Sequence, residues 1–279
     1  MICDLHTHSV FSDGSCTPAE IVDGAIRVGL SAIALTDHNT VDGLPDFISA
    51  AHGKKIDVAP GAEFSVEYEG KELHVLGLFI PQRYFAQVSD LMTSVNKRKE
   101  ESNIALIDSL NQAGYRLDYE TIKSATPNGK INRAHIAAAM VEKGYIGSVK
   151  EGFDTLLSKS AGHYKEPVRL SAEEMIDFIS SIGAVSVLAH PFLNLTEQEL
   201  VAFLSVAKGL GGLECYYSTY DEETTNKSLR IAEGFGLAFS GGSDFHGATK
   251  PDIQLGVGKG NLATPYEWVL ELKKKVSAI

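Results

Sequence analysis

Short apolar runs that alternate with helix-length segments constrain the fold of this 279-residue chain more than any other feature. Near the start of the chain we expect strands at residues 2–7, 32–36, 56–64 and 72–80, and helices from residue 18 and over residues 41–51. Strands separated by helices favour parallel pairing, because a parallel neighbour requires a long crossover connection. The pattern therefore predicts an α/β domain with a parallel sheet.

The alternation stops between residues 82 and 163, where the pattern becomes helical throughout. A long polar-faced helix is expected over 85–113, and shorter helices over 133–143 and 149–158. Strand signals resume at 184–189, 213–217 and 237–240, each followed by a helix-length segment. We therefore expect a distorted TIM-like (β/α)7 barrel formed by residues 1–81 and 164–279, with residues 82–163 as an inserted helical lid domain.

Several helix starts carry a capping-box pattern, in which Ser or Thr is followed three residues later by Glu. The pattern begins at Thr17, Ser171, Thr196 and Thr264. The first side chain satisfies a free backbone N–H of the helix and the glutamate reaches back to the cap, so each pattern predicts where a helix begins.

Composition limits the classes of function. A formal net charge of −11 argues against a surface dedicated to duplex nucleic acid, although a local metal cluster would still attract a small phosphorylated substrate. Three scattered cysteines predict neither a disulfide framework nor a thiolate zinc site, and they fit a reducing cytoplasm. We expect no membrane-spanning helix and no secretion signal ahead of the first strand. No obligatory protein partner is evident.

Histidines and carboxylates gather at the predicted strand ends. The set comprises His6, His8, Asp13, His38, Glu63, His74, His190, Asp244 and His246. Residues i and i+2 of a strand share a face, so His6 and His8 can point at one ion. A lone strand histidine is more often a hydrogen-bonded core or surface residue. The whole set at the carboxyl ends of parallel strands, where barrel active sites lie, instead predicts a metal cluster.

The sequences around these residues resemble the signature of the PHP (polymerase and histidinol phosphatase) superfamily. The matching stretches are Asp4-Leu5-His6-Thr7-His8, Thr36-Asp37-His38, Gly61-Ala62-Glu63, Ala189-His190-Pro191 and Ser243-Asp244-Phe245-His246. The chain is most similar to the branch that dephosphorylates nucleoside monophosphates and 3′,5′-bisphosphates, which also includes 5′-to-3′ exoribonucleases acting on short RNA. The long helical insertion is similar to that branch too.

The resemblance implies how the metal ions are held. The first ion would be bound by His6, His8, Glu63 and Asp244. A second would share Glu63 with His74 and His190, and a third would use Asp13, His38 and His246. Many trinuclear relatives have histidine at the position of Asp13, whereas the branch named above often has the aspartate. The first two sites are therefore expected to bind metal more firmly than the third.

The ligand types then indicate the chemistry. Imidazole and carboxylate suit Mn²⁺, Fe²⁺ or Zn²⁺, so we expect two or three divalent ions. Such ions generate a hydroxide that attacks phosphorus in line and neutralise the phosphoryl oxygens. The leaving alkoxide is stabilised by a metal ion or protonated by a nearby acid. His190 and Asp244 are the candidate catalytic residues.

Residues of the insertion are candidates for binding the substrate phosphate. Asn132-Arg133-Ala134-His135 resembles the lid motif of the family, in which Arg133 and His135 reach the phosphate, and Lys165 is a further candidate. The alternatives are an ordinary exposed arginine at a helix start and a solvated lysine. Asp37 either orients His38 or caps the turn that follows the strand.

These observations predict a metal-dependent phosphoesterase that hydrolyses phosphomonoesters of small nucleotides, either 5′-nucleoside monophosphates or 3′,5′-bisphosphates. The alternative is a 5′-3′ exoribonuclease acting on short 5′-phosphorylated RNA. A metal-dependent amidohydrolase and an inactive metal-binding module are weaker alternatives. The first commonly requires a carboxylated lysine among the ligands, and the second would show degenerate ligand positions.

Overall fold

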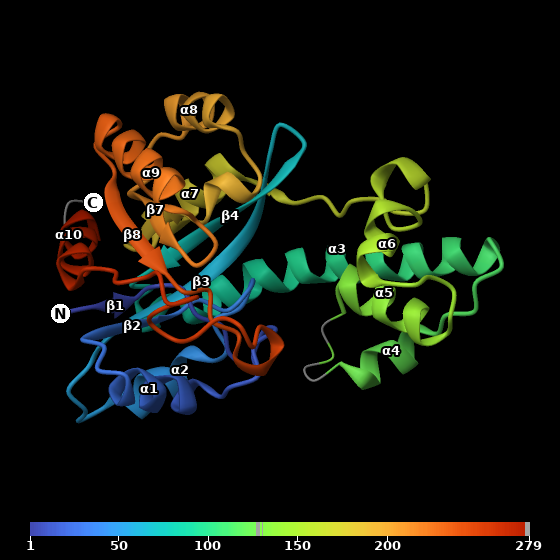
Figure 1. Cartoon of the computed structure of the whole chain (residues 1–279), viewed down its shortest axis with the longest axis horizontal. Helices are drawn as coiled ribbons and strands as arrows, with labels where there is room; N and C mark the ends of the chain where they lie inside the picture. The colour runs from blue at the N-terminus through green and yellow to red at the C-terminus, as the bar shows by residue number, and fades with distance from the viewer. Residues whose placement is uncertain (127–128, 130, 277–279) are drawn as a thin grey trace. The chain divides into compact units, whose positions relative to one another are not determined.

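A computed structural model describes residues 1–126, 129 and 131–276 (Figure 1). The chain forms two compact units, one made of residues 1–90 and 169–279 and the other of residues 91–168. The boundaries expected from sequence, after residues 81 and 163, lie a few residues earlier. The helix α3 (Phe85–Gln112) runs through the first boundary without interruption.

The first unit is built on one sheet. Its strands are β1 (Cys3–Asp4), β2 (Ala32–Leu35), β3 (Asp57–Tyr68), β4 (Lys71–Leu78), β5 (Leu170–Ser171), β6 (Val185–Leu188), β7 (Gly212–Tyr217) and β8 (Ala238–Gly242). Their order is β1-β2-β3-β4-β6-β7-β8, with β5 paired to β3. The amide of Leu5 donates to the carbonyl of Gly241 at 3.1 Å, and a bridge joins Thr7 to Phe245. These contacts bring β1 beside β8, so the seven strands on this path form a nearly closed barrel, as predicted.

Two strand pairs differ from the expected parallel arrangement. β4 is antiparallel to both β3 and β6, so the prediction of parallel pairing was wrong here. Glu69 and Gly70 alone connect β3 to β4, with φ angles of 48° and 76°. Two consecutive left-handed residues form the tight turn of a β-hairpin, and so short a connection cannot return the chain in the parallel direction. The reversal brings the first half of β4 to the barrel end where the parallel strands finish.

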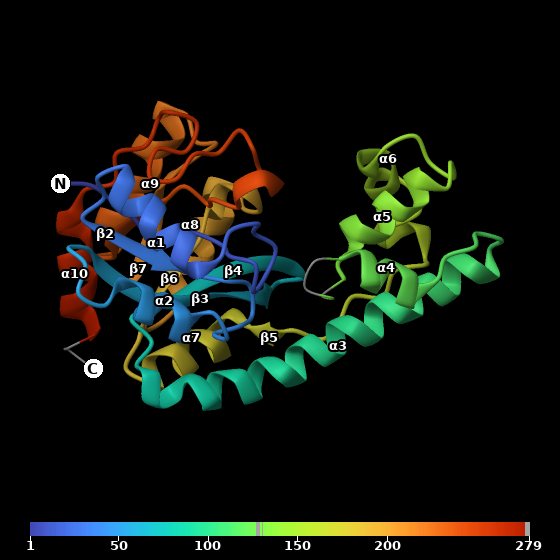
Figure 2. The same ribbon diagram turned by 90° about the horizontal axis from the view of Figure 1, so that it is seen from below.

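Helices of this unit cover the barrel. They are α1 (Pro18–Arg27), α2 (Leu44–Ala51), α7 (Ala172–Ser181), α8 (Glu197–Val206), α9 (Glu222–Gly234) and α10 (Tyr266–Val276). The capping boxes at Thr17, Ser171 and Thr196 are present as predicted. α10 begins at Tyr266, one residue later than the pattern at Thr264 predicts. Figure 2 shows α1 and α2 side by side next to β2 and β3.

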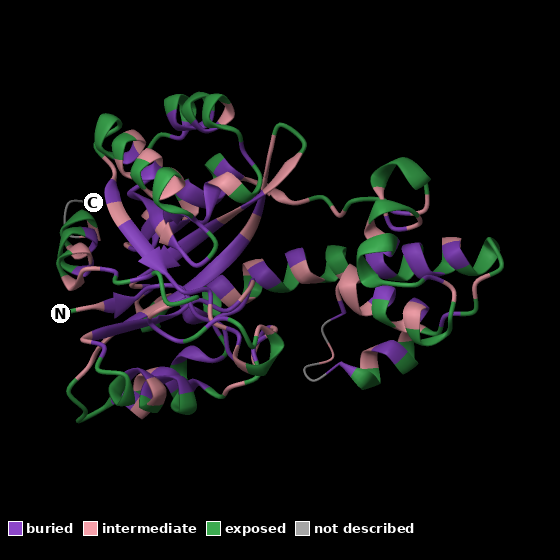
Figure 3. Ribbon diagram, in the orientation of Figure 1, coloured by how far each residue is buried: buried purple, intermediate pink, exposed green. Residues whose placement is uncertain are grey.

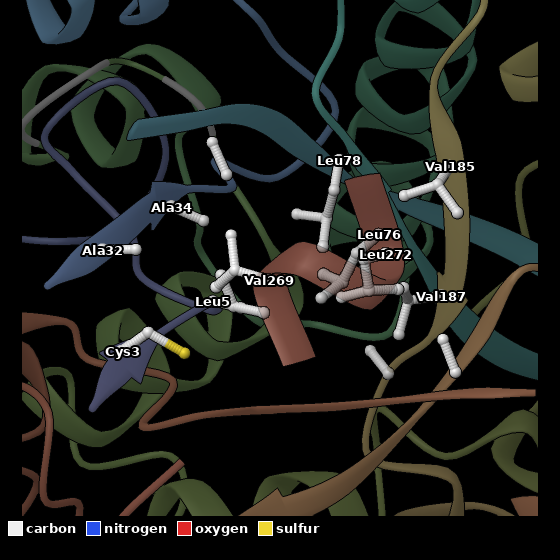
Figure 4. Packing of buried hydrophobic residues seen from close by; sticks show 13 residues of the cluster. Cys3, Leu5, Ala32, Ala34, Leu76, Leu78, Val185, Val187, Val269 and Leu272 are labelled. Carbon is white, nitrogen blue, oxygen red and sulfur yellow. The ribbon is translucent and has the colours of Figure 1, made fainter. Parts of the chain in front are cut away.

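The core of the barrel is apolar. Figure 4 shows a cluster in which side chains of β1, β2, β4 and β6 pack against α10. Leu76, Val187 and Leu272 in this cluster are fully buried. Figure 3 shows the same division over the whole unit, with buried strands inside and exposed helix faces outside. Burial of this apolar surface is the main force that holds the strands together.

The second unit is helical. Besides most of α3 it contains α4 (Tyr119–Ala125), α5 (Arg133–Glu142) and α6 (Val149–Asp154). Leu106, Leu110, Ile136, Met140 and Leu157 belong to its own buried core. α6 ends four residues before the predicted end at residue 158. Within the described residues, no helix is long and apolar enough to span a membrane.

Candidate metal centre

Polar side chains meet at one end of the barrel, where the parallel strands finish. The structure brings together all nine residues that the sequence singled out: His6, His8, Asp13, His38, Glu63, His74, His190, Asp244 and His246. Most of them follow the ends of β1, β2, β6 and β8, which is where barrels place their active sites. His74 lies in the first half of β4, and it reaches this end because β4 runs antiparallel to its neighbours.

The carboxylate of Glu63 lies at the middle of the cluster and is fully buried. Its Oε1 is 2.8 Å from Nδ1 of His74 and 2.9 Å from Nε2 of His190. Its Oε2 is 3.3 Å from Nε2 of His6, 3.3 Å from Nε2 of His8 and 3.0 Å from Nδ1 of His38. Glu63 therefore has imidazoles at both oxygens, which is the arrangement that a carboxylate shared between two ions requires.

Two aspartates close the remaining sides of the cluster. Oδ1 of Asp244 lies 3.2 Å from Nε2 of His8 and 3.6 Å from Nε2 of His6. Oδ1 of Asp13 lies 3.2 Å from Nε2 of His246 and 3.8 Å from Nδ1 of His8. His8 thus faces both aspartates as well as Glu63, so it lies near more carboxylates of the cluster than His6, which also follows β1.

The unpaired atoms of the cluster fit a set of cations. In the described part of the chain, every buried side-chain nitrogen or oxygen without a hydrogen-bond partner, apart from Ser240 Oγ, belongs to these residues: His6 Nε2, His8 Nδ1, His8 Nε2, Asp13 Oδ1, Glu63 Oε2, His74 Nδ1 and His190 Nδ1. A buried polar atom without a partner is costly. In this cluster, lone pairs of nitrogen and oxygen atoms approach one another without forming hydrogen bonds. Metal ions coordinated between these atoms would satisfy the lone pairs. The donor set, imidazole and carboxylate, fits divalent transition metals.

The donors fall into four overlapping groups, whose ligand atoms lie within 4.8 Å of one another in each group. The groups are His8–Asp13–His38–His246, His6–Glu63–His190, His6–His8–Asp244 and His38–Glu63–His74. His38 joins both the group around Asp13 and the group around Glu63. These groups have the donors needed to bind divalent metal ions. The division into the three sites implied by the family resemblance stays a prediction.

Mutual electrostatics in the cluster hold the carboxylates ionised. Burial alone would raise the pKa of Glu63, but His38, His74 and His6 outweigh it and hold that pKa well below its usual range. Burial alone would lower the pKa of His8, whereas Asp244 and Glu63 raise it to about 9. The pKa of His74 is likewise raised, against the effect of burial, to about 10 by Glu63 and Glu72. Without metal, protons therefore take the place of cations on His8 and His74. His38 differs, because burial lowers its pKa to about 3.

A glutamate that sequence reasoning missed supports two of the candidate ligands. Glu214 is fully buried in β7. Its Oε1 accepts a hydrogen bond from Nδ1 of His6 at 3.0 Å, and its Oε2 accepts one from the backbone N–H of His190 at 2.7 Å. The available signal was a charged residue inside the apolar run Gly-Leu-Glu-Cys-Tyr-Tyr, because a buried carboxylate needs partners.

Two further aspartates organise the loops that carry the ligands. Asp37 accepts hydrogen bonds from the backbone N–H of Ser9 at 2.7 Å and from the hydroxyl of Ser12 at 2.6 Å. These contacts match neither of the two roles considered for Asp37, because they hold the loop after β1 rather than His38 or the turn that follows β2. Asp4 accepts from the backbone N–H of Ser243 at 2.9 Å and of Gly256 at 2.8 Å, which ties the segment after β8 to β1.

The backbone is strained at two candidate ligands. His190 has a φ angle of 27° and Asp244 one of 56°, a region that residues with a Cβ rarely adopt. Gly242 precedes Asp244, and a Cβ at Gly242 would lie 2.5 Å from the backbone nitrogen of His6. Only glycine allows β8 to approach β1 this closely. Strained backbone at a polar cluster is typical of functional sites.

The candidate phosphate-binding residues all lie in the helical unit. Arg133 begins α5, and its guanidinium lies 4.2 Å from the centre of the Tyr164 ring and 5.3 Å from that of Phe153. Nδ1 of His135 accepts from the backbone N–H of Asn132 at 3.1 Å within a capping box. The carbonyl of Lys165 accepts from the hydroxyl of Ser102. Phosphate binding by Arg133, His135 and Lys165 stays a prediction.

Characterised relatives cover most of the chain. A Haemophilus influenzae protein named 5′-3′ exoribonuclease is 29% identical over 87% of this chain and 89% of its own. A Chromobacterium violaceum protein named 3′,5′-nucleoside bisphosphate phosphatase is 30% identical over 87% of this chain and 86% of its own. An Eggerthella lenta protein named phosphoribosyl 1,2-cyclic phosphate 1,2-diphosphodiesterase is 29% identical over 88% of this chain and 95% of its own.

Solved structures match the fold over nearly the whole chain. A Bifidobacterium adolescentis protein assigned as a metal-dependent phosphoesterase has a TM-score of 0.79 and 26% identity, covering 98% of this chain and 96% of its own. An amidohydrolase from Chromobacterium violaceum with bound sulfate and no metal has a TM-score of 0.83 and 26% identity, covering 99% and 97%. The PHP domain model matches residues 4–186, which is more than half of the sequence. The chain therefore belongs to the PHP domain family and is a metal-dependent phosphoesterase.

Proposed function

We propose that this protein hydrolyses a phosphomonoester of a small nucleotide, either a 5′-nucleoside monophosphate or a nucleoside 3′,5′-bisphosphate. The observation that carries the proposal is the Glu63 carboxylate, which is buried and has histidine nitrogens within 3.3 Å of both oxygens. This arrangement supports two ions side by side, which suits displacement at phosphorus. The relative named as a nucleoside bisphosphate phosphatase supports the choice of substrate.

The chain would hold two or three divalent ions, with Mn²⁺, Fe²⁺ and Zn²⁺ as the candidates. His6, His8, Glu63 and Asp244 would hold the first. Glu63, His74 and His190 would hold the second, and Asp13, His38 and His246 the third. When bound, such ions supply an activated water nucleophile and neutralise charge on the phosphoryl group. The side chains fix these positions because most of them are buried at the ends of rigid strands.

Of the two candidate catalytic residues, His190 is the better proton donor. Burial alone would raise the pKa of Asp244, but His8, His6 and Lys250 hold it well below its usual range, so this group stays a carboxylate. His190 is nearly buried, and its Nδ1 has no hydrogen-bond partner. His190 therefore remains our candidate for protonating the leaving alkoxide, besides its place among the candidate ligands, and we keep Asp244 as a ligand.

The insertion would contribute the phosphate contacts. A guanidinium offers paired donors that match phosphate oxygens, and the Tyr164 ring stacked against Arg133 limits the motion of that fork. His135 and Lys165 would add further donors. The natural partner is a small phosphorylated molecule. A cytoplasmic location suits the three cysteines, which are all free thiols.

Exonucleolytic cleavage of short 5′-phosphorylated RNA is the second candidate function. The Haemophilus influenzae relative named 5′-3′ exoribonuclease favours it, and the same metal centre would serve both reactions. An exonuclease needs a basic or aromatic track that holds successive nucleotides. A net charge of −11 tilts the balance toward mononucleotides.

The experiment is a substrate panel with protein loaded with Mn²⁺, Fe²⁺ or Zn²⁺. Released phosphate is measured with adenosine 5′-monophosphate, with adenosine 3′,5′-bisphosphate and with a 5′-phosphorylated oligoribonucleotide. We expect phosphate release from one or both nucleotides and little shortening of the oligomer. Shortening of the oligomer from its 5′ end, with both nucleotides untouched, would establish the exonuclease instead.

A further inference from the structure

A cavity of about 330 Å³ lies against the metal centre. Its walls come from residues just after β7 and β8 and from the segment between Lys250 and Lys259. This is the barrel end that carries the candidate ligands, and the volume falls at the lower end of the range for small-molecule sites, about 300–1,000 Å³. The cavity is therefore large enough for part of a nucleotide.

Asp244 joins this cavity to the metal centre, because its two oxygens face different ways. Oδ1 lies 3.2 Å from Nε2 of His8, inside the cluster. Oδ2 accepts hydrogen bonds from the hydroxyl of Tyr217 at 2.9 Å and from Nζ of Lys250 at 2.7 Å, and all three residues line the cavity. A molecule that fills the cavity thus has one end next to a candidate metal ligand.

The charge of the cavity suits an anion once the centre is occupied. Lys250 and Lys259 supply two ammonium groups to the lining, while Asp252 and Asp244 supply the opposing carboxylates. Asp244 neutralises Lys250 in the structure described here. A cation held at Oδ1 of Asp244 would neutralise part of the negative charge of this carboxylate. Less of the positive charge of Lys250 would then be offset, so Lys250 would attract an anion more strongly. Two ammonium groups against one free carboxylate leave the cavity positive.

We propose that the cavity binds the part of the substrate that does not react, and that Lys250 and Lys259 bind a second phosphate group on it. The inference rests on the proposed function and narrows it to substrates with two phosphates. Tyr217 and Ile253 add apolar surface to the lining, against which a sugar or base packs. A nucleoside 3′,5′-bisphosphate has the required chemistry, because one phosphate reacts while the other occupies the cavity.

The test compares Lys259→Gln with Lys208→Gln. Both lysines are exposed, but Lys208 lies just before β7, at the opposite end of that strand from the cavity. The ratio of kcat/KM for adenosine 3′,5′-bisphosphate to kcat/KM for adenosine 5′-monophosphate is measured for each variant with metal bound. We expect Lys259→Gln to lower this ratio about tenfold, since a charge-assisted hydrogen bond is lost. Lys208→Gln should leave it unchanged.

Equilibrium binding keeps this test separate from the proposed function. The dissociation constants of both nucleotides are measured by calorimetry on metal-loaded protein with non-hydrolysable phosphonate analogues of the two nucleotides, which needs no turnover. We expect Lys259→Gln to weaken binding of the bisphosphate several-fold more than binding of the monophosphate. Equal effects on the two nucleotides, in binding and in kinetics, would overturn the cavity assignment. Failure of the wild-type protein to hydrolyse either nucleotide would overturn the proposed function, while the binding comparison still decides the role of the cavity.

A separate observation concerns Glu214, the buried glutamate of β7. One carboxylate holds the ring of His6 and the backbone of His190, which come from opposite ends of the sequence. The hydrogen bond to Nδ1 of His6 leaves Nε2 as the nitrogen that faces Glu63 and Asp244. The hydrogen bond to His190 holds a residue whose φ angle of 27° is strained. The two hydrogen bonds thus orient His6 and His190, both candidate ligands, toward the metal centre.

The geometry points to Glu214 as a positioning residue that sets metal affinity without contacting metal. Glu214→Gln keeps the shape, but its amide NH₂ cannot accept a hydrogen bond, so one of the two contacts is lost. We expect the dissociation constant for Mn²⁺ to rise about 10- to 100-fold, as for other residues that orient metal ligands. Glu233→Gln, on the exposed face of α9, is the matched control and should bind Mn²⁺ like the wild type.

The readout separates positioning from a general loss of structure. Excess Mn²⁺ should restore most of kcat in Glu214→Gln. The absorption spectrum of the Co²⁺-loaded variant should differ from that of the wild type, because the orientation of the His6 ring changes. Unaltered Mn²⁺ affinity in a folded Glu214→Gln would overturn the assignment. If circular dichroism shows that this variant is unfolded, Glu214→Asp serves instead, since it keeps the charge and shortens the reach. Wild-type Mn²⁺ affinity in Glu214→Asp would then count against positioning.

Discussion

The apolar core and the metal centre lie on the same strands but solve different physical problems. β4 contributes Leu76 and Leu78 to the core and His74 to the centre, and β1 is followed by Leu5 and His6 in the same two roles. The core gains stability by removing apolar surface from water. The centre gathers nearly all of the buried polar atoms that lack hydrogen-bond partners in the described residues. The barrel therefore folds through its core, while the centre is completed only by cations.

Removing one central candidate ligand should abolish activity while leaving the apolar core intact, which distinguishes the two regions most clearly. We expect His8→Ala and Asp244→Ala to lower kcat/KM by more than about 100-fold, beyond the usual effect of residues that only orient ligands. His8 belongs to two of the four donor groups, so its removal opens both. Metal content by elemental analysis and phosphate release measure the effect. Full activity in His8→Ala would refute the assignment of the centre.

The converse change removes core packing and spares the ligands. Leu76 is fully buried in the apolar cluster, so Leu76→Ala should cost about 2–5 kcal/mol of unfolding free energy. Urea unfolding of chelator-treated protein gives this value. The number of metal ions bound by the folded variant should match the wild type. Loss of metal from folded Leu76→Ala would show that the two regions are coupled.

The pH dependence of the metal-free protein should report on the histidines of the centre. The pKa of His8 is raised to about 9, and that of His74 to about 10, from about 6.5 in the unfolded chain. A raised pKa stabilises the fold fully below the unfolded pKa and loses that effect as pH rises through the folded pKa. We expect the unfolding free energy to fall between pH 6.5 and pH 10, with about 3 kcal/mol of the decline coming from His8 alone and a further decline from His74. His8→Ala should flatten this decline, and urea titrations at several pH values measure it.

Metal removal should cost a comparable amount at a fixed pH. An ion present at 100 times its dissociation constant stabilises the folded state by about 2.7 kcal/mol if it binds only that state. Chelation should therefore lower the melting temperature of the wild-type protein. The same treatment of Asp244→Ala should lower it less, since one donor group has already lost a member. An equal shift in both proteins would place the stabilising ion elsewhere.

The sequence located the candidate ligands better than it predicted the path of the strands between them. His6 and His8 could be identified because the spacing of two residues and the strand end are both local features. The direction of β4 depended on Glu69 and Gly70, which no apolar periodicity marks. Glu214 was hidden because its partners, His6 and His190, are distant in sequence. Local patterns thus reveal which residues are unusual, while pairing across the barrel appears only in three dimensions.

The smallest predicted effect belongs to the helical unit, which contains the candidate phosphate-binding residue Arg133 but none of the candidate metal ligands. Arg133→Ala should raise KM about tenfold and leave kcat nearly unchanged, because a charge-assisted contact to substrate phosphate is lost while the donor groups stay intact. The KM of Arg133→Lys should lie between those of the wild type and Arg133→Ala, since lysine keeps the charge but lacks the planar guanidinium. The guanidinium also packs on Tyr164, so thermal unfolding of each variant shows whether the unit remains folded. A fall in kcat with unchanged KM in folded Arg133→Ala would move this residue from substrate binding to the transition state.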